Sequence, residues 1–135
     1  MSSHKEYQLV LESRALYLFA HVTGPRDTLQ ISIAYWSEIA AECTRLNVQR
    51  LLVLEELEER STATDMAEMI QLLPKMGFKD LRLAFVDPKE AIGMLAFAEV
   101  RAIEAGLTGH VFGAFAPAEK WLLSDAARAR DGSAF

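Results

Sequence analysis

The sequence is poor in cysteine, in clustered basic residues and in long apolar runs. Cys43 is the only cysteine of 135 residues, so one chain can form neither a disulfide nor a cysteine-based zinc site. The net charge of -5 disfavours a nucleic-acid partner, because phosphate binding needs clustered cations. No apolar run approaches the roughly 20 residues that cross a bilayer, and the opening residues lack an apolar segment of signal-peptide length. We therefore expect a soluble, cytoplasmic protein without a membrane span.

Chemical motifs are also scarce. His4, His21 and His110 lie far apart in the sequence, and no nucleophile motif such as Gly-x-Ser-x-Gly accompanies them. Neither a phosphate-cradling loop nor a calcium-binding loop spacing is present. Cys43 falls on the apolar face of a predicted helix, where a thiol behaves as a small hydrophobic group. We therefore expect no enzyme activity, no catalytic residue, no metal and no cofactor.

The composition fits one packed domain. Hydrophobic residues make up 51% of the chain and charged residues 24%, which is too apolar for a disordered protein. The length suits a single domain, and no repeat or linker divides it. We predict one domain over residues 1–135, with short flexible termini at about 1–5 and 130–135.

Alternating strand and helix patterns predict an α/β fold in the order β-β-α-β-α-β-α-β-α. We expect a mixed, mostly parallel sheet of about five strands with helices packed on it. The run at 49–54 is nearly continuous in apolar residues, which is typical of a central parallel strand. The segment 23–27 contains Gly24 and Pro25 and is expected to end the preceding strand. The predicted segments are a hairpin over 7–22, helices over 28–46, 61–73 and 90–105, strands over 49–54, 81–86 and 110–115, and a last helix from Pro117.

A group of hydroxyl residues follows the predicted central strand. Ser61, Thr62 and Thr64 stand where the second helix begins, and each can accept a hydrogen bond from a free N–H group of the first turn. Asp65 suits the positive end of the helix dipole, and the spacing from Thr62 to Asp65 resembles a capping box. The same hydroxyls are candidate phospho-acceptors. Helix cap and phosphorylation site both stay open here.

Glutamates just before these hydroxyls form a strongly acidic segment. Glu56, Glu58, Glu59 and Arg60, together with Glu55, are expected to form a loop after the strand. Two interpretations remain for this loop. It faces a protein partner, or it is a solvated segment that keeps the strand end from aggregating.

The third predicted helix is apolar on nearly all sides of its first half. A helix of this kind is usually covered all round. Three interpretations stay open: burial in the core, a homodimer surface, or a groove for an apolar ligand. Methionine side chains adapt to such ligands. The candidate lining residues are Met66, Met69, Met94 and Phe97.

Three stretches carry a resemblance to a known family: VTGPRD before the first predicted helix, QRLLVLEEL at the central strand, and VFGAFAPAEKWL near the end. On these fold patterns, over about 7–123, the chain resembles the SpoIIAA-like proteins of the STAS/SEC14 group. That group includes anti-sigma-factor antagonists and lipid-carrying domains. In the antagonists, a partner kinase phosphorylates a serine at the position that matches Ser61. This chain has Arg60-Ser61-Thr62-Ala63 where those relatives have an Asp-Ser pair followed by a glycine.

The resemblance implies a small bacterial regulatory or protein-interaction module, and the lack of catalytic motifs predicts that it is not an enzyme. We also expect a homodimer, for which the apolar third helix offers a surface. The alternative is a carrier of a small apolar or lipid-like ligand, which follows from the apolar third helix and the methionines.

Overall fold

The structure, a computed structural model, describes the backbone of residues 6–131 and the side chains of residues 6–124. The predicted flexible terminus at 1–5 lies outside the described residues. Of the terminus predicted at 130–135, only Arg130 and Asp131 are described, and both belong to the last helix.

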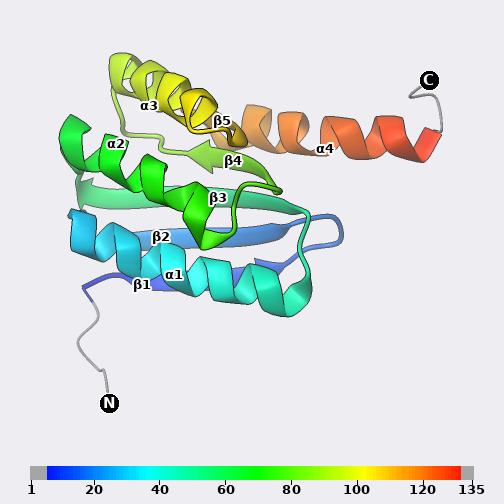
Figure 1. Cartoon of the computed structure of the whole chain (residues 1–135), viewed down its shortest axis with the longest axis horizontal. Helices are drawn as coiled ribbons and strands as arrows, with labels where there is room; N and C mark the ends of the chain where they lie inside the picture. The colour runs from blue at the N-terminus through cyan, green and yellow to red at the C-terminus, as the bar shows by residue number, and fades with distance from the viewer. Residues whose placement is uncertain (1–5, 132–135) are drawn as a thin grey trace.

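Five strands form one sheet in the order β1-β2-β3-β4-β5. The first two strands pair antiparallel, and the other three neighbouring pairs are parallel. The carboxyl ends of the four parallel strands therefore lie along one edge of the sheet (Figure 1). The strands are β1 (Gln8–Ser13), β2 (Leu18–Arg26), β3 (Arg50–Glu59), β4 (Arg82–Val86) and β5 (Thr108–Phe112).

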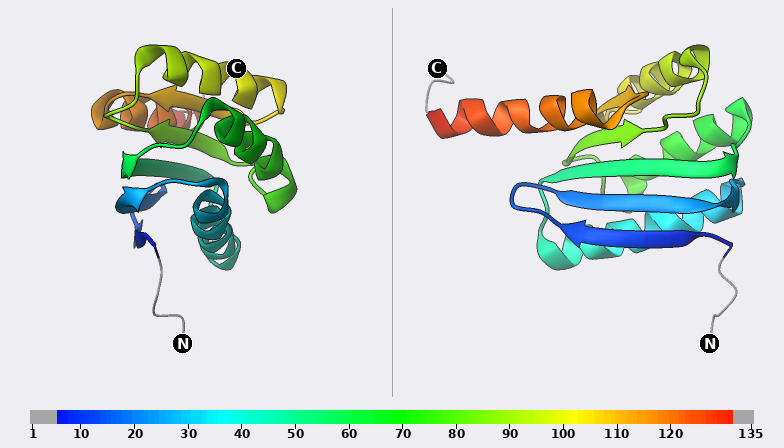
Figure 2. Two further views of the ribbon diagram at one scale, coloured as in Figure 1. Left: turned by 90° about the vertical axis from the view of Figure 1, so that its left-hand side faces the viewer. Right: turned by 180° about the vertical axis from the view of Figure 1, so that it is seen from behind.

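Helices cover both faces of this sheet. The first three pack on one face and the last on the other, as the end view in Figure 2 shows. The second half of the last helix extends beyond the sheet (Figure 1). No described helix is both long and apolar enough to cross a membrane. The helices are α1 (Leu29–Leu46), α2 (Ala63–Leu72), the short 3-10 helix η1 (Leu73–Met76), α3 (Ile92–Glu104) and α4 (Phe115–Asp131).

Each face of the sheet has its own apolar core because strand side chains alternate between faces. Leu51, Val53 and Leu57 of β3 lie on the face of α1, α2 and α3, and Leu52 lies on the α4 face. Trp36 of α1 packs edge-on against Phe78, with ring centroids 5.2 Å apart. The α/β class and the mixed sheet of five strands predicted from the sequence are confirmed.

Two strands are longer than predicted. β2 does not end at residue 22 but continues to Arg26, since Gly24 and Arg26 pair with Leu57 and Glu59 while Pro25 is skipped. A Cβ at Gly24 would lie 3.0 Å from the carbonyl oxygen of Glu6, so glycine suits this close approach. The prediction that β3 ends at residue 54 was likewise wrong. It runs to Glu59, and the expected acidic loop is strand, because pairing with β2 satisfies its backbone.

The boundaries of the last two elements also shift. β5 runs from Thr108 to Phe112, so it overlaps the predicted strand over 110–115 but begins and ends earlier. α4 begins at Phe115, which makes Pro117 its third residue. A proline is tolerated there because the first N–H groups of a helix have no intrahelical acceptor.

Of the three interpretations of α3, complete burial within the chain's own core is not observed. Ile92, Val100 and Ile103 are 85%, 53% and 58% exposed, whereas Ala98 and Ala102 are buried. α3 lies at the edge of the helix layer, against α2 and the edge strand β5 (Figure 1). Its small residues approach the sheet, and part of its apolar surface remains in contact with solvent.

Candidate functional site

The helix face of the sheet contains a partly open pocket bounded by α1, α2 and α3. The cavity volume is about 80 Å³, and the space including the open mouth is about 640 Å³. Most of the wall is apolar, as is typical of small-molecule sites. Its side chains come from α1 (Trp36), α2 (Met66, Met69, Ile70), η1 (Leu73), β4 (Leu83, Phe85) and α3 (Ala98, Ala102).

Polar side chains gather at one end of this pocket. Asp27 directly follows β2, Glu55 lies in the carboxyl-terminal half of β3, and Asp87 directly follows β4. Because neighbouring parallel strands end at the same edge, these three carboxyl groups come close together. All three are buried. Asp27 and Glu55 line the pocket, together with Ser32 and Tyr35 of α1 and Ser61 from the segment before α2.

Hydrogen bonds hold these acids in place. The Ser32 hydroxyl donates to Asp27 Oδ1 at 2.6 Å, and the Tyr35 hydroxyl donates to a Glu55 carboxyl oxygen. Asp87 Oδ1 accepts from the backbone N–H of Lys89 at 3.1 Å. Ser32 and Tyr35 are three residues apart on α1 and therefore point to the same side of the helix. One face of α1 thus supports two of the three acids.

Burial changes the proton affinity of the cluster. Loss of solvation raises the pKa of Asp27, Glu55 and Asp87, because the charged form is disfavoured away from water. For Glu55 the neighbouring charges of Asp27 and Asp87 raise the pKa further. Burial and the nearby carboxyl groups also raise the pKa of Tyr35. The three carboxyl groups of the cluster therefore hold their protons more tightly than exposed carboxyl groups do.

The three acids do not form a recognisable metal centre. Among the described residues, no group of three or more His, Cys, Asp or Glu side chains is arranged to hold a metal ion. The side chains that line the pocket offer hydrogen bonds and charge pairing within an apolar wall.

Two of the four predicted apolar-site residues lie in this pocket. Met66 and Met69 of α2 line it. Met94 and Phe97 are half-buried on α3 and lie outside the lining. The structure thus separates a group that sequence analysis had treated as one surface.

The predicted hydroxyl residues take different positions at the start of α2. Thr62 is the N-cap residue, and its Oγ1 accepts from the backbone N–H of Asp65 at 3.1 Å. Ser61 is half-buried and lines the pocket, and Thr64 is exposed in the first turn. Only Thr62 among the three forms the capping hydrogen bond.

The predicted acidic segment lies on the outer face and end of β3. Glu56 Oε1 lies 2.7 Å from His21 Nε2, and Glu58 and Glu59 are exposed. Arg60 Nε lies 3.5 Å from Glu90 Oε1, which links the segment before α2 to the segment before α3. These side chains do not enter the pocket.

Sequence analysis missed the inner members of the cluster, Asp27, Glu55 and Asp87. A usable signal was present, because Leu57 follows Glu55 by two residues and shows that the inward alternation of β3 continues. An aspartate directly after each neighbouring strand was the second signal. Their meeting depends on strand pairing, which the sequence does not display.

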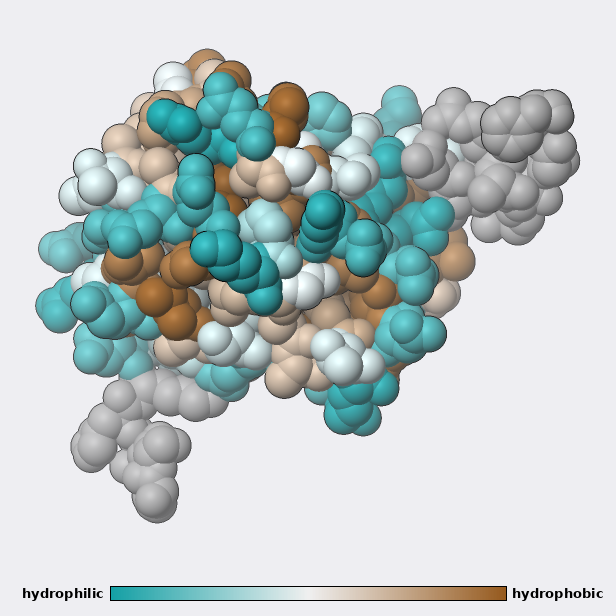
Figure 3. Space-filling model, viewed as in Figure 1, coloured by the Kyte–Doolittle hydropathy of each residue, from teal (hydrophilic) through white to brown (hydrophobic). Residues whose placement is uncertain are grey.

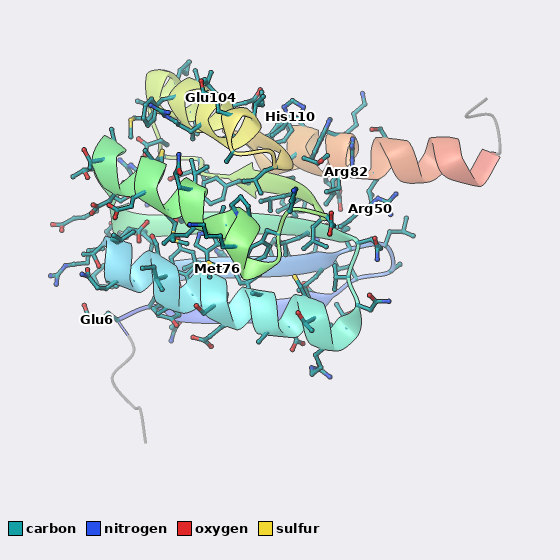
Figure 4. All side chains as sticks on the ribbon, viewed as in Figure 1. Glu6, Arg50, Met76, Arg82, Glu104 and His110 are labelled. Atoms are coloured by element: carbon teal, nitrogen blue, oxygen red, sulfur yellow. The ribbon has the colours of Figure 1, made fainter. Side chains whose placement is uncertain are left out.

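The His110 side chain contacts residues of α3 and α4. Its Nδ1 lies 3.1 Å from Glu99 Oε2, and its ring packs edge-on against Trp121 at 4.7 Å. Glu99 Oε1 also accepts from the backbone N–H of Val111 at 2.9 Å, which covers part of the edge strand β5. Figure 4 shows His110 and Arg82 beside the beginning of α4, and His110 also borders the pocket.

The comparisons with known proteins add no family assignment to this geometry. A scan against models of protein families gives no match for this chain, and a search among curated proteins finds no similar sequence.

Proposed function

We propose that this chain is a non-enzymatic binding protein whose pocket holds a small, mainly apolar molecule with one polar group. The observation that supports this proposal is the pocket itself, which has an apolar wall and a few buried polar groups at one end. Its interior is narrow, so a ligand of several carbon atoms suits it better than a whole phospholipid.

Methionine methyl groups provide a direct test. Hexan-1-ol, as a probe with six carbons and one hydroxyl, is titrated into protein with ¹³C-labelled methionine methyls. We expect saturable shifts of the Met66 and Met69 signals, which line the pocket, and little change at Met94, which does not. Absence of saturable shifts at Met66 and Met69 would contradict the proposal.

A space-filling variant sharpens the test. Ala102 is buried on α3 and lines the pocket, so Ala102→Leu is expected to occupy the space and abolish the methionine shifts. Val100→Leu is the matched control, because this residue is exposed on the same helix. Equal hexan-1-ol binding by both variants would place the probe elsewhere.

A second proposal is a regulatory protein-interaction module of the SpoIIAA-like type that forms a homodimer. It is supported by the exposed apolar residues of α3, since Ile92, Val100 and Ile103 recur on one side of the helix. Brown, apolar surface lies over α3 at the top of Figure 3. The proposal includes a cytoplasmic location, because a chain with a single cysteine, Cys43, forms no intramolecular disulfide and suits a reducing compartment.

Sedimentation velocity tests the dimer. Ile103→Lys is expected to shift a dimer to a monomer, because an ammonium group would be buried at the interface. Leu16→Lys is the control, since this exposed residue lies between β1 and β2, away from α3. Monomeric wild-type protein, or equal dissociation of both variants, would contradict the proposal.

A further inference from the structure

The polar end of the pocket contains acids without an opposing basic side chain in its wall. Asp27 and Glu55 are the acidic lining residues, and no Lys or Arg lines the described pocket. His110 also borders it, but its ring is engaged by Glu99 and Trp121. The groups that face Glu55 are Asp27 after β2, Tyr35 on α1, and Asp87 after β4. At Asp87 the charge of Glu90 raises the pKa of the carboxyl group and the charge of Arg60 lowers it.

The hydrogen bonds already formed leave acceptor capacity in this end. An ionised carboxyl group has about four lone-pair sites. Ser32 occupies a site on Asp27, Tyr35 occupies sites on Glu55 and Asp27, and Asp27 and Glu55 are also hydrogen-bonded to each other. A donor-rich group without acceptors matches this environment. A primary ammonium group has three donors, one positive charge and no acceptor.

We propose that the pocket selects a small apolar molecule ending in a primary amine, with its ammonium group between Asp27 and Glu55 and its hydrocarbon part against Met66 and Met69. This inference rests on the proposed binding function and specifies its ligand class. It disfavours fatty acids, because their carboxylate would lie beside two or three other carboxyl groups.

Binding of an amine is coupled to release of a proton. The amine enters as R–NH₃⁺, and a carboxyl group that is protonated in the free protein loses its proton to solvent, so that an ion pair forms in the pocket. The affinity for an amine therefore increases with pH until that carboxyl group is already ionised in the free protein. An alcohol binds without a change in ionisation, so its affinity stays nearly constant.

Three probes of equal chain length test the inference by isothermal titration calorimetry: hexylamine, hexan-1-ol and hexanoate. We expect hexylamine to bind about tenfold or more tightly than hexan-1-ol, because charge-assisted hydrogen bonds are stronger than neutral ones. Hexanoate is expected to bind more weakly than the alcohol. Titration of hexylamine in buffers of different ionisation enthalpy is expected to reveal proton release.

The matched variants are Glu55→Gln and Glu58→Gln, which remove one carboxyl group from the same strand. Glu58 is exposed on the outer face of β3, so its variant is expected to keep the preference for hexylamine. Glu55→Gln is expected to lose that preference, and a cooperative urea denaturation curve shows that the variant is folded. Equal effects of the two variants would overturn the inference.

The probes separate this inference from the proposed function. Equal binding of hexylamine and hexan-1-ol would overturn the amine preference and leave the binding function standing. Tighter binding of hexanoate would do the same. Failure of all three probes to bind would overturn both.

Discussion

Glu55 differs from the glutamates around it because its side chain lies on the inner face of β3. It is 6% exposed, whereas Glu58 and Glu59 are in contact with solvent. Alternation along the strand explains the difference, since residues 51, 53, 55 and 57 face α1, α2 and α3. Glu55 is thus the one residue of this acidic segment that is buried at the pocket, and Glu58 and Glu59 belong to the solvated surface.

The two hydroxyl residues directly before α2, Ser61 and Thr62, are expected to differ in what they contribute to stability. Thr62→Ala is expected to lower the free energy of unfolding by about 1 kcal/mol, because the N–H group of Asp65 loses its acceptor. Ser61→Ala removes a hydroxyl one residue earlier and is expected to change it by less than about 0.5 kcal/mol. Urea denaturation measures both values. A larger loss in Ser61→Ala than in Thr62→Ala would show that Ser61, and not Thr62, caps the helix.

At the scale of elements, local pattern predicted most segments but not their ends. The apolar run before residue 54 predicts a strand, and the glutamates after it favour a loop. Pairing with β2 overrides that preference, because Thr23, Gly24 and Arg26 provide partners for the extended strand. In α3 the apolar composition left core burial, a dimer surface and a ligand groove open, and its position at the edge of the helix layer leaves Ile92 exposed.

The candidate site was predictable to a smaller extent. Met66 and Met69 were identified because helical spacing places them on one face, and that face borders the pocket. The carboxyl groups were not identified, because Asp27, Glu55 and Asp87 belong to three segments separated by whole helices. Only the parallel pairing of β2, β3 and β4 brings them together.

The backbone conformation at the end of α1 restricts which residues suit that position. Asn47 follows the helix with φ 54° and ψ 52°, a left-handed conformation that asparagine and glycine tolerate. Asn47→Gly is expected to change the free energy of unfolding by less than about 0.5 kcal/mol, and Asn47→Val to lower it by about 1–2 kcal/mol, as a β-branched side chain is strained there. Thermal or urea unfolding measures the difference.

A control within the same helix separates conformation from side-chain chemistry. Thr44→Val introduces the same side chain at an exposed position inside α1, where the backbone is helical. We expect its effect to stay within about 0.5 kcal/mol. Equal losses in Asn47→Val and Thr44→Val would show that the left-handed conformation is not the cause.

In the whole molecule, the two faces of the sheet are closed to different degrees. α4 is anchored by Arg82, whose guanidinium lies 3.8 Å from the Trp121 ring centroid and donates to the Trp121 carbonyl at 2.9 Å. On the other face, α2 and α3 meet above β3 and β4 through small or flexible residues such as Ala98, Ala102 and Met69. The pocket lies between these helices and the sheet, next to the acid cluster.

The acid cluster gives the whole molecule a characteristic dependence of stability on pH. Burial raises the pKa of Glu55 in the folded protein, whereas the unfolded chain releases this proton near the ordinary value of 4.5. Between that value and the raised pKa, the folded protein binds more protons than the unfolded chain. Its free energy of unfolding therefore falls as the pH rises, by at most about 1.4 kcal/mol per pH unit for one group.

Glu55→Gln tests this dependence because it removes the titrating group and keeps an acceptor for Tyr35. Above pH 4.5 the variant is expected to become more stable than the wild type, by a difference that grows until the folded carboxyl group ionises. Glu58→Gln changes the same charge on the exposed face, so its difference from the wild type is expected to stay nearly constant with pH. Urea denaturation at several pH values between 4 and 8 measures both differences. A pH-independent difference for Glu55→Gln would mean that Glu55 titrates alike in the folded and unfolded chain, which its burial between Asp27 and Asp87 argues against.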